Sequence, residues 1–252
     1  MFVRQLQQTW IVFFLLLAGL SGCLSNDSSE GAIQLGVDIT PNSDSIFEYY
    51  SDGERVSKSN VMVEFDFEST VSVNDLRVFG IDTNDGRPAV TIDATVQTNI
   101  SIEFYDHGTY NITAFAVDEN NVNQSLVFSV PIELRIEWVQ TDTTEPKTLA
   151  FDPRPVNEGI HPAMIEIRSV VENPTFIENQ DASSQSVQIT WNIVDESDDI
   201  CQDLTAYIDD GDAKEWYTIH FNTYLLHELE VTYDEGQDNV DIQHWITVVY
   251  DD

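Results

Sequence analysis

The sequence predicts an all-β chain built from two similar halves, and two observations lead to that prediction. Apolar and polar residues alternate with a period of two in several segments, as they do in strands that bury one face. Segments of this kind also recur in the same order in both halves of the chain. Nothing after the first 36 residues has the spacing of a long amphipathic helix.

Three segments show the alternation most clearly. Residues 61–68 read VMVEFDFE and residues 90–97 read VTIDATVQ, so each places its apolar residues on one face. Residues 126–136 continue one apolar face over a longer run, and Pro131 within it predicts a sheet edge or a bend, because proline cannot donate a ladder hydrogen bond. Turn-forming clusters such as DTNDG and DENN separate these segments.

Three blocks of the first half resemble three blocks of the second half. The pairs are NVMVEFDF (60–67) with SVQITWNI (186–193), DLRVFGIDTNDG (75–86) with DLTAYIDDG (203–211), and the segment from Ile100 to Asn120 with the segment from Tyr217 to Gly236. Chance alternation mimics one block easily, whereas a shared order of three blocks indicates related units. We therefore expect two tandem domains, over 37–138 and 139–252.

The amino-terminal region has the features of a secretory signal. Its apolar core, Trp10 to Leu20, is too short to span a bilayer, which takes about 20 residues. The four residues LSGC that end at Cys23 resemble a lipobox. That resemblance implies removal of residues 1–22, a diacylglycerol on the Cys23 thiol, a tether over 23–36 and a location on the extracellular face of the cell membrane. An ordinary signal peptide with a chance cysteine is the alternative.

The first half also resembles a PKD-type, immunoglobulin-like domain. The similarity lies in YDHGTYNIT at 105–113 with Val117-Asp118 after it, and in part of the turn FGIDTNDG at 79–86. It covers roughly residues 58–134. The resemblance implies tandem immunoglobulin/PKD-like β-sandwiches, and it implies that Tyr110 hydrogen-bonds back to the backbone at a corner of the fold.

The charge of the chain excludes several partners. The formal net charge is −35, from 45 Asp and Glu against 10 Lys and Arg. Nucleic acid and anionic lipid headgroups need a cationic surface, so neither is an expected partner. An acidic surface with very few lysines resembles proteins of salt-adapted organisms, in which ionic strength screens self-repulsion. The 42% of hydrophobic residues argues against disorder, because it is enough to build a core.

Two acidic turns are candidates for weak calcium binding, since Ca²⁺ takes six to eight oxygen ligands from such loops. Their candidate ligands are Asp82, Asn84 and Asp85 in the first half and Asp209, Asp210 and Asp212 in the second. Neither turn has the EF-hand spacing, and ordinary hairpin turns explain both motifs. The five histidines lack the helical spacing of a zinc-enzyme motif. No other cofactor is expected.

Catalytic motifs are missing from the sequence, and we expect no enzymatic activity. No nucleophile elbow, phosphate loop or dinucleotide fingerprint occurs, and acidic pairs are too common to single out two. Cys201 has no partner for a disulfide once Cys23 is lipidated, and we expect a small buried side chain there. Its acidic neighbours disfavour a reactive thiolate.

Two further features concern the surface. Asn99, Asn111 and Asn123 stand in Asn-X-Ser/Thr sequons, which makes them candidate glycosylation sites in a secreted protein, as is Asn26 nearer the amino terminus. Aromatic residues that would stack on sugar rings, or fill the core instead, are Trp138, Trp191, Trp216, Trp245, Tyr217 and Tyr250. We expect Trp191 in the core and either Trp216 or Trp245 facing outward.

These features together indicate a non-enzymatic, lipid-anchored module on the cell surface. By analogy with other sandwich domains it would serve in binding, adhesion or spacing, with membrane lipid held through Cys23 and an envelope protein or glycan as partner. The alternative is an accessory or solute-binding lipoprotein of a transporter or hydrolase system. A ligand-sized apolar pocket between the two domains would favour the alternative, and a convex pair of sandwiches without a cleft would favour the first interpretation.

Overall fold

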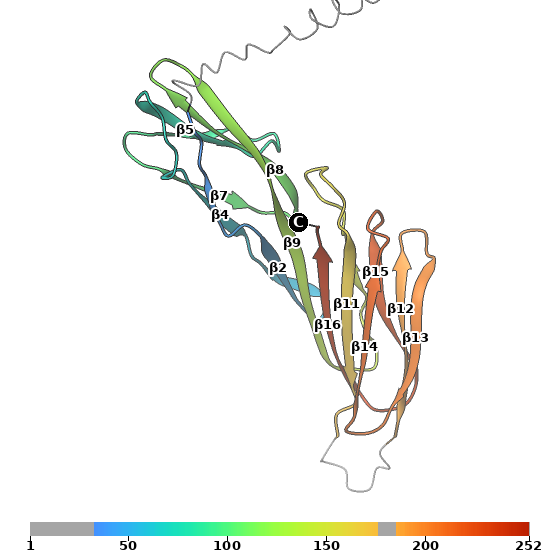
Figure 1. Ribbon diagram of the computed structural model, residues 1–252. Coiled ribbons are helices and arrows are strands. Elements are labelled where there is room, and N and C mark those ends of the chain that lie inside the picture. Colours follow the sequence, from blue (N-terminus) through green and yellow to red (C-terminus); the bar gives the residue numbers. More distant parts are fainter. Residues whose placement is uncertain (1–32, 176–184, 252) are drawn as a thin grey trace, which may run out of the picture. The chain divides into compact units, whose positions relative to one another are not determined.

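The structure, a computed structural model, describes residues 33–175 and 185–251, and this part of the chain is all-β (Figure 1). The strands are β1 (Asp38–Thr40), β2 (Asp44–Ser51), β3 (Glu54–Lys58), β4 (Val61–Asp66), β5 (Leu76–Asp82), β6 (Val90–Asp93), β7 (Asn99–Phe104), β8 (Gly108–Asp118), β9 (Asn123–Thr143), β10 (Leu149–Phe151), β11 (Met164–Glu172), β12 (Val187–Asp195), β13 (Ile200–Ile208), β14 (Ala213–His220), β15 (His227–Glu235) and β16 (Val240–Val249). None of the described residues belongs to a helix long and apolar enough to cross a bilayer.

The strands form sheets that pack face to face as β-sandwiches, which confirms the predicted fold class. In the first half the sheet β1-β4-β7 packs on β6-β5-β8-β9. Phe65 of β4 lies against Phe128 of β9, with ring centroids 5.9 Å apart, and Phe67 stacks on Phe79 of β5 at 4.6 Å. In the second half the sheet β10-β15-β12-β13 packs on β14-β11-β16-β9, where the fully buried Trp191 reaches Trp216 at 6.2 Å.

One long strand, β9, belongs to both halves. It pairs antiparallel with β8 as far as Ile132, then parallel with β2 from Ile132 and antiparallel with β16 from Leu134. Pro131, predicted to mark an edge or a bend, lies where the partners of β9 change. The predicted domain boundary between residues 138 and 139 falls inside β9, so the nine-stranded sheet runs across it.

Three strand pairings recur in the two halves, and by this correspondence two of the three block alignments made from the sequence are wrong. β4 pairs with β7, and β5 pairs with β6 and β8. The same pairings recur as β11 with β14, and β12 with β13 and β15. The structure therefore matches β4 to β11 and β5 to β12, whereas the sequence aligned residues 60–67 with β12. Only the third block, β7-β8 with β14-β15, agrees with the topology.

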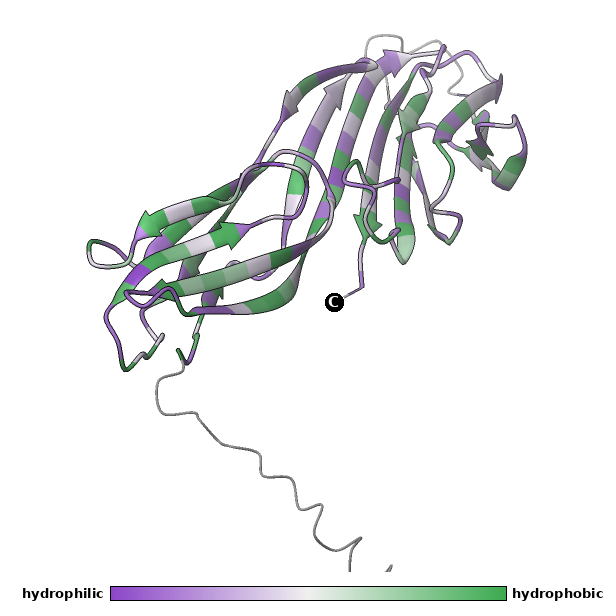
Figure 2. Ribbon diagram, turned by 90° about the horizontal axis from the view of Figure 1, so that it is seen from above, coloured by the Kyte–Doolittle hydropathy of each residue, from purple (hydrophilic) through white to green (hydrophobic). Residues whose placement is uncertain are grey.

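The predicted alternation holds wherever a strand is covered by the opposite sheet. Val61, Val63 and Phe65 of β4 are at most 2% exposed, and Figure 2 shows hydrophobic and hydrophilic residues alternating along the strands. Residues 90–97 differ from the prediction, because Val90 and Val96 are exposed. They lie in and just after β6, an edge strand, whereas Ile92 and Ala94 of the same face pack against the core as predicted.

Candidate functional site

The turn between β7 and β8 is fixed by a tyrosine corner. Tyr110 donates a hydrogen bond from its hydroxyl to the backbone oxygen of Asp106 at 2.8 Å, which confirms the role that the PKD resemblance implied. Burial, with the charges of Asp106 and Asp85, raises the pKa of Tyr110 to about 12, so the hydroxyl stays a donor. Behind the turn, buried His107 contacts the Tyr250 hydroxyl through Nδ1 at 2.7 Å. Two contacts therefore hold this turn in place.

Three adjoining cavities open around this turn, and they share Asp106. Their volumes are about 260, 310 and 210 Å³, and neighbouring cavities have lining residues in common. We call this region the Asp106 groove and define it by Lys58, Asn60, Asp85, Arg87, Tyr105, Asp106, Val156 and Asn157. A concave region on which a few polar groups converge is a candidate for a ligand site.

The charges in the Asp106 groove are all paired. Lys58 Nζ lies 3.0 Å from Asp106 Oδ1, and Arg87 Nε donates to Asp85 Oδ2 at 2.8 Å. Burial acts to raise the pKa of Asp85, but hydrogen bonds from Arg87 and Thr83 outweigh it and hold that pKa below its usual value. The groove thus presents polar, planar groups with little net charge, on a protein whose net charge is −35.

Two exposed apolar groups border these polar groups. Tyr105 is 56% exposed and Val156 is 68% exposed. Asn157, which lines the same cavity, is held in place, because its amide donates to the Thr109 backbone oxygen at 3.1 Å and its Oδ1 accepts from the Gly159 nitrogen at 3.0 Å. An aromatic face beside fixed carboxylate, guanidinium and amide groups suits a ligand with hydroxyls on its edges and apolar C–H groups on its faces.

In the first acidic turn proposed for calcium the side chains already have protein partners, and the second turn is closed by a backbone hydrogen bond. Asp82 Oδ1 accepts from the Asn84 nitrogen at 2.9 Å, and the Asn84 amide donates to the Asn111 backbone oxygen at 2.7 Å. Asp85 is committed to Arg87. In the second half, the Asp212 nitrogen donates to the Asp209 backbone oxygen at 2.9 Å. These contacts are those of hairpin turns, and calcium binding there, with Asp210 included, stays a prediction.

The remaining predicted surface sites are accessible or lie outside the described residues. Asn99 at the start of β7, Asn111 on β8 and Asn123 at the start of β9 are all exposed. Their glycosylation stays a prediction. Cys23 and Asn26 precede the described residues, so lipid attachment and the tether also stay predictions.

The aromatic residues singled out from the sequence are mostly part of the core. Trp138 and Trp191 are fully buried and Tyr250 is 5% exposed, while Trp216 is partly buried. Trp245 is also partly buried, and the Arg168 guanidinium lies over its ring at 4.4 Å. The sequence missed Tyr105, because it lies in a turn, outside the strand alternation that drew attention to the other aromatics.

Cys201 differs from its predicted place in the core. It is exposed on β13, the edge strand of its sheet. Burial, followed by the charges of Asp195 and Asp199, raises the pKa of its thiol, which agrees with the expectation that the thiolate is disfavoured. Among the histidines, His220 lies beside His227, with ring centroids 4.6 Å apart. The Cys201, His220 and His227 side chains come together.

No family model matches the chain, and no curated protein does either. Solved structures with some similarity include carbohydrate-binding modules of the β-sandwich superfamily, at 10% identity and a TM-score of 0.35, over 88% of this chain and 98% of the other. A Bacteroides ovatus SGBP-B, solved with a mixed-linkage heptasaccharide, matches at 10% identity and a TM-score of 0.24, over 82% of this chain and 52% of the other. Fibronectin(III)-like modules of Clostridium thermocellum CbhA match at 11% identity and a TM-score of 0.26, over 79% of this chain and 94% of the other. Likenesses this low carry no information on the ligand of this chain.

Proposed function

We propose that this chain is a non-enzymatic binding module that holds a neutral glycan in the Asp106 groove. The observation that carries the proposal is the exposed ring of Tyr105 beside charges that are already paired. A ligand with a net charge would gain little there, because Lys58 and Arg87 are neutralised by Asp106 and Asp85. A polyhydroxyl ligand gains hydrogen bonds to planar groups and contact with the tyrosine face.

We further propose that the module is lipid-anchored through Cys23 on the extracellular face of the membrane of a salt-adapted cell. The lipobox resemblance supports this, as does the acidic, lysine-poor composition. A tethered sandwich with a groove would hold an envelope glycan near the membrane, as an adhesion module or as a subunit that accompanies a transporter or hydrolase. A Cys23→Ser variant that stays with the membrane in unchanged amount would contradict the anchor.

The glycan proposal is tested by calorimetric titration of the full chain with envelope polysaccharides and defined oligosaccharides at high salt. Tyr105→Ala should weaken binding at least tenfold, equivalent to about 1.4 kcal/mol, because the stacking face is lost. Tyr207→Ala is the matched control, since Tyr207 is 66% exposed on β13 and belongs to none of the three cavities.

Equal weakening by both tyrosine variants would contradict a site in the groove. Capture of an envelope protein instead of any glycan would contradict the ligand class. Asp106→Asn serves as a second groove variant, because it keeps the size of the side chain while it removes the charge that pairs with Lys58.

A further inference from the structure

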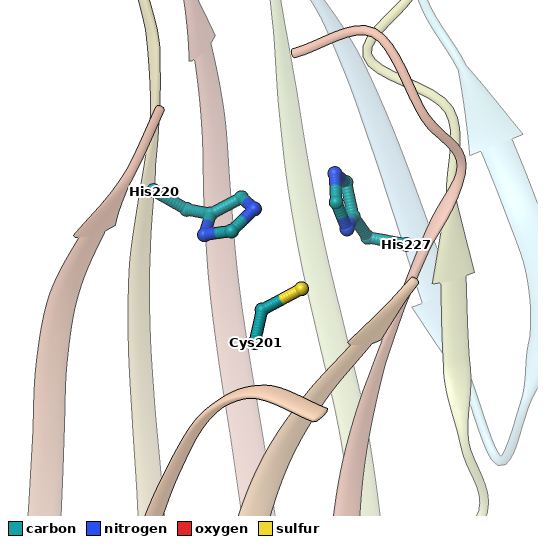
Figure 3. A group of neighbouring side chains, drawn as sticks. All are labelled: Cys201, His220 and His227. Atoms are coloured by element: carbon teal, nitrogen blue, oxygen red, sulfur yellow. The ribbon is translucent and has the colours of Figure 1, made fainter. Parts of the chain in front are cut away.

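Three side chains that bind metals in proteins meet in the second sandwich, away from the Asp106 groove. His220 is the last residue of β14, His227 is the first of β15, and Cys201 lies on β13. Their candidate donor atoms all lie within 4.8 Å of one another. Figure 3 shows the thiol and both imidazole rings pointing toward a common space. Among the residues that the structure describes, no other group of three or more Cys, His, Asp or Glu side chains gathers in this way.

Both imidazoles carry a buried nitrogen without a hydrogen-bond partner. His227 is fully buried and His220 is 7% exposed. His227 Nε2 lies 2.7 Å from the Asn222 backbone oxygen, so this nitrogen carries the proton and donates it. The lone pair is then on His227 Nδ1, which is buried and unpaired, as is His220 Nε2. Such nitrogens are costly to bury, and a metal ion would use both lone pairs.

Local backbone geometry explains how Cys201 comes to face the histidines. Ile193 of β12 pairs with Gln202 and Val194 pairs with Ile200, so Cys201 is the extra residue of a β-bulge. A bulge redirects the side chain of its extra residue, and bulges are common next to functional sites. The thiol is therefore not placed by the simple alternation of β13.

A carboxylate lies beside the thiol. Asp195 Oδ1 accepts from the Ser197 and Asp199 backbone nitrogens at 2.8 and 3.2 Å, which fixes the orientation of the group. Its other oxygen, Oδ2, lies 4.0 Å from Cys201 Sγ. Asp195 also pairs with His227 in the β12-β15 ladder. A bound cation would find a negative charge next to its ligands.

We propose that Cys201, His220 and His227 bind one zinc-class transition-metal ion. Two imidazole nitrogens and a thiolate suit such an ion, whereas Ca²⁺ and Mg²⁺ require oxygen ligands. Ligands of a tetrahedral site lie about 3.5 Å apart, given metal–ligand distances of about 2.0–2.3 Å, so the three donors close in slightly on binding. The Cys201 thiol releases its proton to solvent when the metal–sulfur bond forms. The fourth position is left to water or a further ligand, near Asp195.

The site would join the two sheets of the second sandwich. His220 ends a strand of the nine-stranded sheet, while Cys201 and His227 belong to the four-stranded sheet. The loop between His220 and His227 connects β14 of one sheet to β15 of the other. A metal ion here adds a second, non-covalent link, so binding should raise the thermal stability of the sandwich.

The test is a cobalt titration of the full chain, carrying no histidine tag and kept reduced with a thiol-free reductant. Co²⁺ should produce thiolate-to-cobalt charge-transfer absorption together with visible bands of a four-coordinate ion, and Zn²⁺ should displace it. Weak binding of Co²⁺ to the many surface carboxylates gives no thiolate absorption, so it is distinguished from binding at the proposed site. Zn²⁺ should also raise the melting temperature.

Matched variants make the result decisive. Cys201→Ser should abolish the charge-transfer absorption, and His220→Gln should weaken binding more than about 100-fold, because loss of an outer partner alone costs about 10–100-fold. His107→Gln removes a buried histidine elsewhere and should leave the titration unchanged. Melting without metal checks that each variant folds. Absence of thiolate absorption in the parent, or its persistence in Cys201→Ser, would overturn the proposal, while glycan binding would be unaffected.

Discussion

Buried polar side chains in the second sandwich form a network around His244, and the burial of this histidine keeps it neutral. Trp191 Nε1 donates to Ser169 Oγ at 2.7 Å, and an indole nitrogen can only donate. Ser169 Oγ in turn lies 2.8 Å from His244 Nδ1. Trp138 stacks on the ring, with centroids 4.8 Å apart. Complete burial lowers the pKa of His244 to about 3.

His244 should make the protein less stable as the pH falls. The unfolded chain takes up the proton near pH 6.5, whereas the folded chain resists it down to about 3, so the contribution is complete above pH 6.5 and is lost below it. The expected slope is about 1.4 kcal/mol per pH unit. Urea unfolding of the parent and of His244→Phe, compared from pH 7 to pH 4, isolates this group. A difference between the two that does not change with pH would contradict the prediction.

Strands were predictable as elements, but their partners were not. The alternation in residues 61–67 marks a half-buried strand correctly, since Val61, Val63 and Phe65 are buried. Period-two alternation does not indicate which strand is the neighbour of another. Residues 186–193 therefore fitted as the counterpart of residues 60–67 on their alternation alone. Pairing with β7 or β14 decides the correspondence, and that information is long-range. The bulge at Cys201 escaped prediction for the same reason, because a bulge is defined by its partner strand.

The shared strand β9 should couple the unfolding of the two halves. All the tryptophans in the described residues lie on β9, β12, β14 and β16, so their fluorescence follows the second half. Phe65→Ala removes a buried ring that packs on Phe128 of β9 in the first half, at a cost of about 3–5 kcal/mol. The fluorescence midpoint on heating should fall by roughly 6–20 °C.

Met62→Ala is the matched control for this experiment, because Met62 lies on the same strand and is 54% exposed. It should leave the midpoint nearly unchanged. Two separate transitions in calorimetry, with the fluorescence midpoint unmoved by Phe65→Ala, would mean that the halves unfold independently.

For the whole molecule, the sequence predicted the fold class and the character of the surface better than the sites. Charge and apolar content are counted directly from the composition, and neither depends on how the strands are paired. The Asp106 groove needs residues from four distant segments, around Lys58, Asp85, Tyr105 and Val156, and the metal group needs three strands. Chain spacing carries no trace of either. The turn that holds Tyr105 and Asp106 was noticed only for its resemblance to a family motif.

The net charge of −35 should make stability rise with salt. Repulsion among carboxylates acts over the Debye length, which is about 30 Å at 0.01 M salt and about 3 Å at 1 M. Salt also screens favourable surface ion pairs, but each of those contributes only about 0–1 kcal/mol, and acids greatly outnumber bases. The melting temperature should therefore climb steadily with NaCl. A variant with five exposed carboxylates changed to amides, at Glu54, Glu68, Glu119, Asp203 and Glu235, should be more stable at low salt and less sensitive to it. A parent whose melting temperature is flat or falls with salt, or a variant with the same slope, would show that self-repulsion does not limit the fold.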